Sequence, residues 1–281
     1  MASILRTALL AAFVLGFSII PVQAGPVFLT GHDPDFHGQF SVGAQDFLET
    51  ALDFVMSGQL DDNVHKFLWV ESAGPATGGH VIGANTLALL GLTAGVDYDV
   101  VDAAGFAAAD LSGYTAIAVA STFGGMLTSA ELNALIARSA DIASFINAGG
   151  GLFASAECDA SFSDCDGSNL SAAHGPLFGF LPVAVSSVST SPPYVLTAFG
   201  ATLGFSAAAI GYINECCTHN SFGAVGGLSI VDTDSAGHAT TLAGIVRVGD
   251  GGFTPVPEPA TVTLFGVALA GYFRTRGRSR H

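Results

Sequence analysis

Two stretches, TAIAVAS at residues 115–121 and LTSAELNALIARSADIASFINAGGGLFASAE at residues 127–157, decide the fold class. The first is a short apolar run rich in β-formers. In the second, Thr128 and Glu131 form a capping box, which predicts the start of a helix. Apolar side chains then recur at helical spacing until a glycine triplet at 149–151, after which a second buried apolar run follows. Strand, helix and strand in this order predict a parallel βαβ unit.

The same alternation appears before this unit. We expect strands at Val27 to Thr30, Lys66 to Val70 and Tyr98 to Val101, and a helix at Val81 to Leu90. Another helix is expected from an apolar stripe at helical spacing, formed by Phe40, Ala44, Phe47, Leu48, Ala51, Leu52 and Val55. Several such units in succession predict an α/β fold with a doubly wound, mostly parallel sheet. Additional C-terminal strands are expected at Val183 to Val188, Leu228 to Asp232 and Thr241 to Val248.

The segment from Leu111-Ser112-Gly113-Tyr114 to Glu157 resembles the class I glutamine amidotransferase-like superfamily, in particular its trehalose-utilisation-type, flavodoxin-like domains. In those domains a helix that ends in a glycine triplet leads into a central strand. The resemblance implies a cysteine nucleophile on a tight, glycine-flanked turn after that strand. Here Cys158 lies near that place without flanking glycines, and Asp159 opposes thiolate formation. We therefore do not expect glutamine hydrolysis.

The two ends of the chain differ from its body. Arg6, an apolar run and small residues before Ala24 predict a signal peptide over residues 1–24 that signal peptidase removes. Of the 23 acidic residues, residues 25–255 hold 22, against only three basic residues, Lys66, Arg138 and Arg247, which gives a formal charge of −19. Such an anionic body excludes nucleic-acid binding and is compatible with cations or a hydrated polysaccharide matrix.

The C-terminal 26 residues, 256–281, combine Pro257-Glu258-Pro259, a short apolar run and four arginines. The apolar run is shorter than the roughly 20 residues of a spanning helix. This tail closely resembles the PEP-CTERM sorting signal. The resemblance implies a Gram-negative bacterium that makes exopolysaccharide, a transient association of the tail with the inner membrane, and removal of the tail by an exosortase near Pro257. The alternative is an ordinary C-terminal membrane anchor.

Four cysteines, Cys158, Cys165, Cys216 and Cys217, would lie in an oxidising compartment after export, so we expect disulfides. Their number allows three pairings. Pairing within each loop would require a strained bridge between the adjacent Cys216 and Cys217, so we favour bridges that join the two loops.

Ligands of open parallel sheets bind beyond the carboxyl ends of the strands. The loop after the first strand is therefore a candidate binding site. His32, Asp33, Asp35 and His37 lie in this loop and are ligand types for a divalent cation. The alternative is that the two aspartates cap the following helix while the histidines are solvated.

Two further loops contain candidate catalytic residues. Glu157 follows a buried strand directly, and His219 lies beside the second pair of cysteines; together with His174 they form a candidate acid/base or metal cluster. The alternatives are a calcium loop at Asp164, Asp166 and Ser168, or loops held together only by disulfides and turns.

The sequence thus predicts a secreted, exosortase-processed envelope or exopolysaccharide-matrix protein. Its body over residues 25–255 would have a binding or structural role. The alternative is a metal-assisted extracellular hydrolase or isomerase that acts on carbohydrate.

Overall fold

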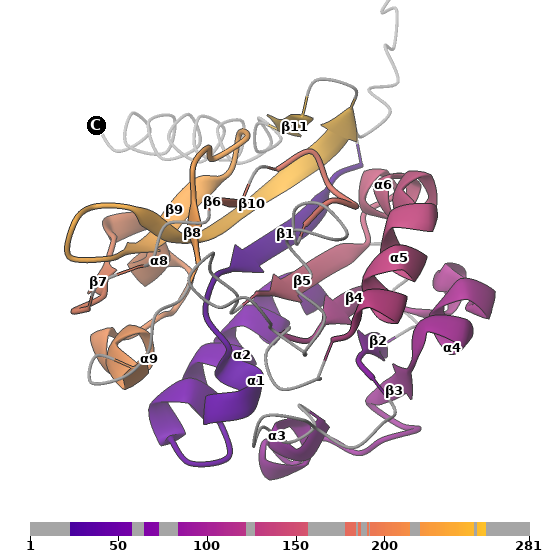
Figure 1. The fold of residues 1–281 in the computed structure, drawn as a ribbon, viewed down its shortest axis with the longest axis horizontal. Coiled ribbons are helices and arrows are strands. Elements are labelled where there is room, and N and C mark those ends of the chain that lie inside the picture. Colours follow the sequence, from indigo (N-terminus) through magenta and orange to yellow (C-terminus); the bar gives the residue numbers. More distant parts are fainter. Residues whose placement is uncertain are drawn as a thin grey trace, which may run out of the picture. The chain divides into compact units, whose positions relative to one another are not determined.

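A mixed β-sheet with helices packed against it forms the framework of the chain in the computed structural model (Figure 1). The structure describes residues 23–57, 65–72, 84–121, 127–156, 178–183, 185–186, 190, 192–213, 220–249 and 252–256. All of them belong to one unit, Gln23–Glu258. Within these ranges no helix combines the length and the apolar character needed to cross a membrane.

Five parallel strands form one half of the sheet. They are β1 (Gly25–Thr30), β2 (Phe67–Val70), β3 (Tyr98–Val101), β4 (Ala116–Val119) and β5 (Gly151–Ser155). Their order is β3-β2-β4-β5-β1, and every neighbouring pair is parallel. The first four follow the 2-1-3-4 order of flavodoxin-like sheets, with the N-terminal strand in the fifth place. The α/β class and the parallel βαβ unit are therefore confirmed.

Helices cover both faces of this half (Figure 1). One face of this half carries α2 (Val42–Met56) and α3 (Ala84–Leu89), and the other carries α4 (Ala103–Ala108), α5 (Ser129–Ala137) and α6 (Ser139–Asn147). Two short helices, α8 (Ala198–Thr202) and α9 (Ala207–Ile210), pack against the antiparallel half and against α2, respectively. Side chains alternate between the faces along each strand. Phe28, Trp69 and Phe153 therefore pack under α2, whereas Leu29, Val70 and Ile117 belong to the core under α5 and α6.

The other half of the sheet is antiparallel and is built from the C-terminal part of the chain. The long strand β10 (Ala239–Gly249) pairs antiparallel with β1. Around it lie β6 (Val185–Ser186), β7 (Val195–Leu196), β8 (Ser221–Phe222), β9 (Ser229–Thr233) and β11 (Gly252–Pro255). The expected additional strands are present, which confirms this part of the prediction. The remaining elements are the short helix α1 (Pro34–His37) and the 3-10 turns η1 (Leu111–Gly113) and η3 (Gly211–Ile213).

The helix predicted from Thr128 begins with the expected capping box but is divided in two at Arg138. The Arg138 guanidinium donates to the backbone carbonyls of Phe106 (2.6 Å) and Ala109 (2.9 Å) at the end of α4. It also lies 5.2 Å from the Phe106 ring centroid, within cation–π range. These contacts attach Arg138 to the C-terminal end of α4 at the residue where α5 ends and α6 begins.

Two details refine the sequence interpretation. Phe40 was expected on the buried stripe of α2, and this is wrong: it precedes Ser41, the N-cap of α2, and is 75% exposed. The backbone conformation and close packing also explain why glycines occupy this triplet. Gly149 has a φ of 104°, and a Cβ on Gly151 would lie 2.0 Å from the carbonyl oxygen of Val55, so only glycine lets α2 approach β5 this closely.

Candidate functional site

The loop after β1 lies at the carboxyl ends of the parallel strands. It is located between β5 and the antiparallel half of the sheet. The backbone of Gly31 donates to the carbonyl of Thr240 (2.8 Å) and accepts from the amide of Asn220 (3.2 Å). On the other side, the amide of Ala156 donates to the carbonyl of Thr30 (2.9 Å). The backbone at Ala156, Asn220 and Thr240 therefore meets the chain at the end of β1.

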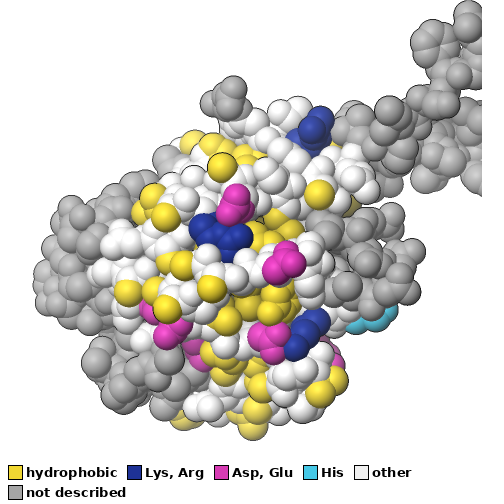
Figure 2. Space-filling view, turned by 90° about the vertical axis from the view of Figure 1, so that its right-hand side faces the viewer, with side chains coloured by type: hydrophobic (Ala, Val, Ile, Leu, Met, Phe, Trp, Pro, Cys, Tyr) yellow, Lys and Arg dark blue, Asp and Glu magenta, His cyan; other side chains and the backbone are white. Residues whose placement is uncertain are grey.

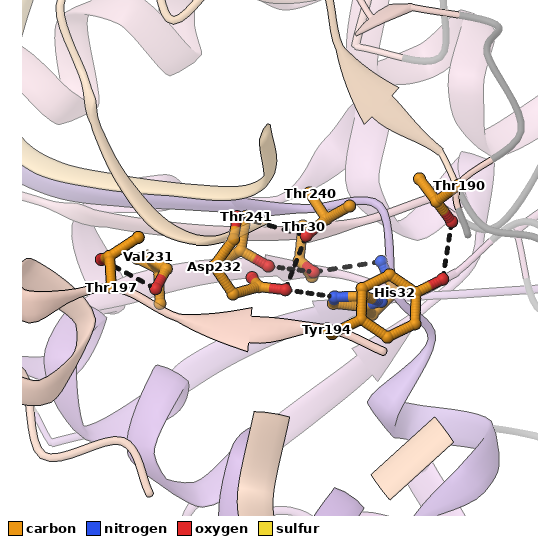
Figure 3. A network of polar contacts seen from close by, with 9 residues as sticks. All are labelled: Thr30, His32, Thr190, Tyr194, Thr197, Val231, Asp232, Thr240 and Thr241. Carbon is orange, nitrogen blue, oxygen red and sulfur yellow. Dashed lines mark hydrogen bonds and ion pairs between the residues drawn. The ribbon is translucent and has the colours of Figure 1, made fainter. Parts of the chain in front are cut away.

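His32 forms a buried pair with Asp232 of β9 (Figure 3). The distance from His32 Nε2 to Asp232 Oδ2 is 2.9 Å, and both side chains are fully buried. The Thr240 hydroxyl donates to the same carboxylate oxygen (2.6 Å). The backbone amide of His32 donates to Thr30 Oγ1 (3.0 Å), which is also 3.0 Å from Thr241 Oγ1. This network joins β1, β9 and β10 through side chains as well as through the sheet.

Aromatic rings enclose the His32 imidazole. The Tyr194 ring stands edge-on to it, with 4.6 Å between the centroids, and Phe47 lies at 5.8 Å. The Tyr194 hydroxyl is 2.6 Å from Thr190 Oγ1. Burial raises the pKa of Tyr194 to about 12; the Thr190 hydrogen bond opposes the increase, and the charge of Asp232 adds to it. Tyr194 is therefore neutral at pH 7.

Asp33 and His37 form a second pair one helical turn apart. His37 Nε2 lies 3.4 Å from Asp33 Oδ1, and the side-chain exposure is 16% for the histidine and 0% for the aspartate. Burial, with the nearby His32 as a smaller cause, lowers the pKa of His37 to about 4. The imidazole is therefore neutral at pH 7.

Asp35 connects the loop after β1 to the loop after β4. Its Oδ2 accepts the backbone amide of Ser121 (2.8 Å), and its own carbonyl accepts the Thr86 hydroxyl (2.5 Å). The side chain is fully buried. Burial raises the pKa of Asp35 to about 6, although the amide of Ser121 acts in the opposite direction.

Glu71 is a buried carboxylate that our sequence reasoning missed. It follows β2 directly, beside the point where the strand order reverses between β2 and β4. It accepts from Trp69 Nε1 (2.8 Å) and from the amide of Ala84 (3.3 Å) at the start of α3. A carboxylate directly after a buried strand was the signal that pointed to Glu157, and the same signal identifies Glu71.

The four predicted metal ligands are divided among separate partners. His32 pairs with Asp232, His37 with Asp33, and Asp35 with Ser121. In the described part of the chain, no group of three or more His, Cys, Asp or Glu side chains is arranged to hold a metal ion. The alternative of capping aspartates and solvated histidines is also wrong in part, because His32 is fully buried and Asp33, at the N-cap of α1, makes no side-chain capping bond. The aspartates and His32 are instead internal to the fold.

The other predicted site residues lie outside the described residues. These are Glu157, His174 and His219, the cysteines Cys158, Cys165, Cys216 and Cys217, and the calcium-loop residues Asp164, Asp166 and Ser168. Asn220, the residue after His219, donates its backbone amide to the carbonyl of Gly31 at the end of β1. The catalytic group and the disulfides stay predictions.

A family model for the PEP-CTERM protein-sorting motif matches residues 255–279. The match covers nearly all of the predicted tail, including Pro257, Glu258 and Pro259, which lie outside the described residues. The motif implies exosortase as the processing partner and a secreted, cell-envelope protein that passes through the inner membrane. No curated protein and no solved structure matches the chain.

Proposed function

We propose that the chain is an exported protein, trimmed by signal peptidase and by exosortase, whose body has a binding or structural role in the envelope or in the exopolysaccharide matrix. One observation carries the proposal. The folded body begins with β1 at Gly25, directly after the predicted cleavage at Ala24, and ends with β11 at Pro255, where the matched sorting motif begins. Processing at both ends would therefore leave complete every strand of the described part of the chain.

The register of the sheet supports this proposal further. Gly25 of β1 and Pro255 of β11 both face Val246 of β10, from opposite sides. With about 4.8 Å between neighbouring strands, the two ends of the body are about 10 Å apart. The points at which the two processing signals are attached to the body are thus close together. This is expected of a precursor whose two ends are both processed at the same membrane.

The buried network favours a binding or structural role over catalysis. His32, Asp33 and Asp35 are 0% exposed, so no substrate reaches them in this conformation. We also propose an amidotransferase-like origin for the body, which the order of β3-β2-β4-β5 and the strand that follows the glycine triplet support. Loss of glutaminase activity accords with the unusual surroundings of Cys158 in the sequence.

The charge of the body suits a hydrated matrix. Lys66 and Arg138 are paired with Asp99 (2.7 Å) and Asp141 (2.9 Å), so they form no basic patch. Figure 2 shows one face on which the basic side chains are few and lie apart from one another. A surface of this kind repels polyanions and remains well hydrated.

The proposal is tested by expressing the full chain in a Gram-negative host, with and without an exosortase, and measuring the intact mass of the product. We expect a chain that begins at Gly25 in both strains and loses its tail only where the exosortase is present. Glu258→Ala should block the loss of the tail without affecting the N-terminal cleavage. A tail that is retained in the presence of an active exosortase would overturn the proposal.

The metal-assisted hydrolase or isomerase is the second candidate, and one observation favours it. Among the described residues, the buried Asp35 Oδ1 makes no hydrogen bond of good geometry, although the Ser121 hydroxyl and the amide of Phe36 are near enough to lower the pKa of the carboxyl. A bound cation would satisfy this atom and lower the pKa of the carboxyl. Stoichiometric metal in the purified protein would favour this candidate.

A further inference from the structure

We infer that Phe253 controls how fast exosortase removes the tail, because it holds β11 in the sheet directly before the sorting motif. The inference rests on the proposed function and deepens it: the sorting motif becomes available to the enzyme when β11 separates from β10. Phe253 is a positioning residue here, since it acts on the position of the motif and not on the bond that is cut.

The sorting motif begins inside the folded body. Pro255, the first matched residue, pairs with Val246 of β10, and the amide of Val256 donates to the carbonyl of Ile245 (3.3 Å). Pro257 is the next residue. The chain therefore has no free residue between the sheet and the Pro-Glu-Pro motif.

Phe253 fixes β11 from both sides. Its side chain is 6% exposed and belongs to the core under α5 and α6. Its amide donates to the carbonyl of Gly226 (3.2 Å), on the side of β11 away from β10. Its own carbonyl lies 2.4 Å from the place where a Cβ on Gly227 would be, so the loop backbone at 226–227 is in close contact with the strand.

Recognition of an extended peptide commonly uses the backbone hydrogen-bonding groups of that peptide, as in the addition of a strand to a sheet edge. For a cut near Pro257, the residues before the bond are Pro255 and Val256, and Val256 already donates to β10. The four residues from Val256 to Pro259 reach at most about 14 Å when fully extended. While β11 stays in the sheet, the folded body would therefore limit the access of the enzyme to the backbone before the cleaved bond.

When opening and closing are fast relative to cleavage, the cleavage rate follows the population of the open form. Truncation of a buried phenylalanine strongly weakens the element that it anchors. We therefore expect Phe253→Ala to increase the rate of tail removal by a factor of about ten or more, until a later step becomes limiting.

Phe222→Ala is the matched control. Phe222 is also 6% exposed and belongs to the same core, but it lies on β8, away from β11. It should lower the overall stability to a similar extent without releasing β11. A third variant places ten Gly and Ser residues between Pro255 and Val256, which frees the motif while Phe253 stays in place.

The experiment is a pulse-chase of the full chain in cells that contain the exosortase, with the conversion of precursor to trimmed protein as the readout. We expect faster conversion for Phe253→Ala and for the insertion, an unchanged rate for Phe222→Ala, and no further acceleration when Phe253→Ala is combined with the insertion. Equal rates for wild type, Phe253→Ala and the insertion would overturn the inference and leave the proposed function intact. Equal acceleration by the Phe222 and Phe253 variants would also overturn it, because general unfolding would then explain the effect. Failure of every chain to be trimmed would refute the proposed function itself.

Discussion

Replacing Asp35 by asparagine tests how a carboxyl group is accommodated in the buried loop after β1. Asparagine has nearly the same shape, and its side-chain oxygen can still accept the amide of Ser121, which donates to Asp35 Oδ2 at 2.8 Å. The substitution therefore removes the charge while it keeps the link between the loops after β1 and β4.

The magnitude follows from the pKa of Asp35, which burial raises from 3.8 to about 6. A raised folded-state pKa means that this group's stabilising contribution is complete below about pH 4 and is lost as the pH rises through about 6. At about 1.4 kcal/mol for each pH unit, the ionised carboxylate costs the fold about 3 kcal/mol at neutral pH relative to the neutral acid. Asparagine is neutral throughout. The free energy of unfolding of Asp35→Asn, minus that of the wild type, should therefore rise by about 2.5 kcal/mol between pH 4 and pH 7.5.

His37 has the opposite pH dependence. Burial lowers its pKa from 6.5 to about 4, so its contribution is present above pH 6.5 and is lost as the pH falls through about 4. In the wild type these two trends oppose each other between pH 4 and pH 6.5. In Asp35→Asn only the trend of His37 remains, so the variant should lose stability on acidification. The 16% exposure of His37 screens part of this effect.

The assay is urea unfolding of the processed protein from pH 4 to pH 7.5, followed by the fluorescence of Trp69, the only tryptophan, which is fully buried. A difference between variant and wild type that does not change with pH would refute the reasoning, because Asp35 would then titrate normally. A variant that is less stable than the wild type at pH 7.5 but not at pH 4 would show that the carboxylate is ionised and held by a cation.

Two further predictions concern the packing around the same loop and strand. In the same urea titration, His32→Ala should lower the free energy of unfolding by about 3–5 kcal/mol, because it leaves the buried Asp232 without its imidazole partner. Gly151→Ala should destabilise by about 1–3 kcal/mol or more, because the added Cβ would lie 2.0 Å from a backbone oxygen of α2. Gly249→Ala, in β10 with no atom within 4 Å of the added Cβ, is its control, and equal melting temperatures for the two glycine variants would contradict the steric argument.

The parallel half of the sheet could be predicted because its signals are local. The apolar runs, the capping box at Thr128 and the alternation of strand and helix each depend on neighbouring residues. The contacts of Arg138 with the end of α4 could not be predicted, since the accepting carbonyls lie about 30 residues away in the chain. Phe40 was misplaced because helical spacing alone does not show where a helix begins.

The site was harder to predict for the same reason. His32 and its loop are visible in the sequence, but the partner of His32 is Asp232, 200 residues later. That pairing depends on how β1, β10 and β9 align, which a single sequence does not reveal. Glu71 could have been predicted, because a carboxylate directly after a buried strand is a local sequence pattern.

We propose that the imidazoles and carboxylates at the end of β1 are internal architecture and not a metal centre, and elemental analysis tests this central proposal most directly. The sample is the processed protein from exosortase-containing cells, as wild type and as Asp35→Asn. The account predicts no stoichiometric metal in either protein. About one metal ion per chain in the wild type, lost in the variant, would contradict it and make the loop after β1 a metal centre.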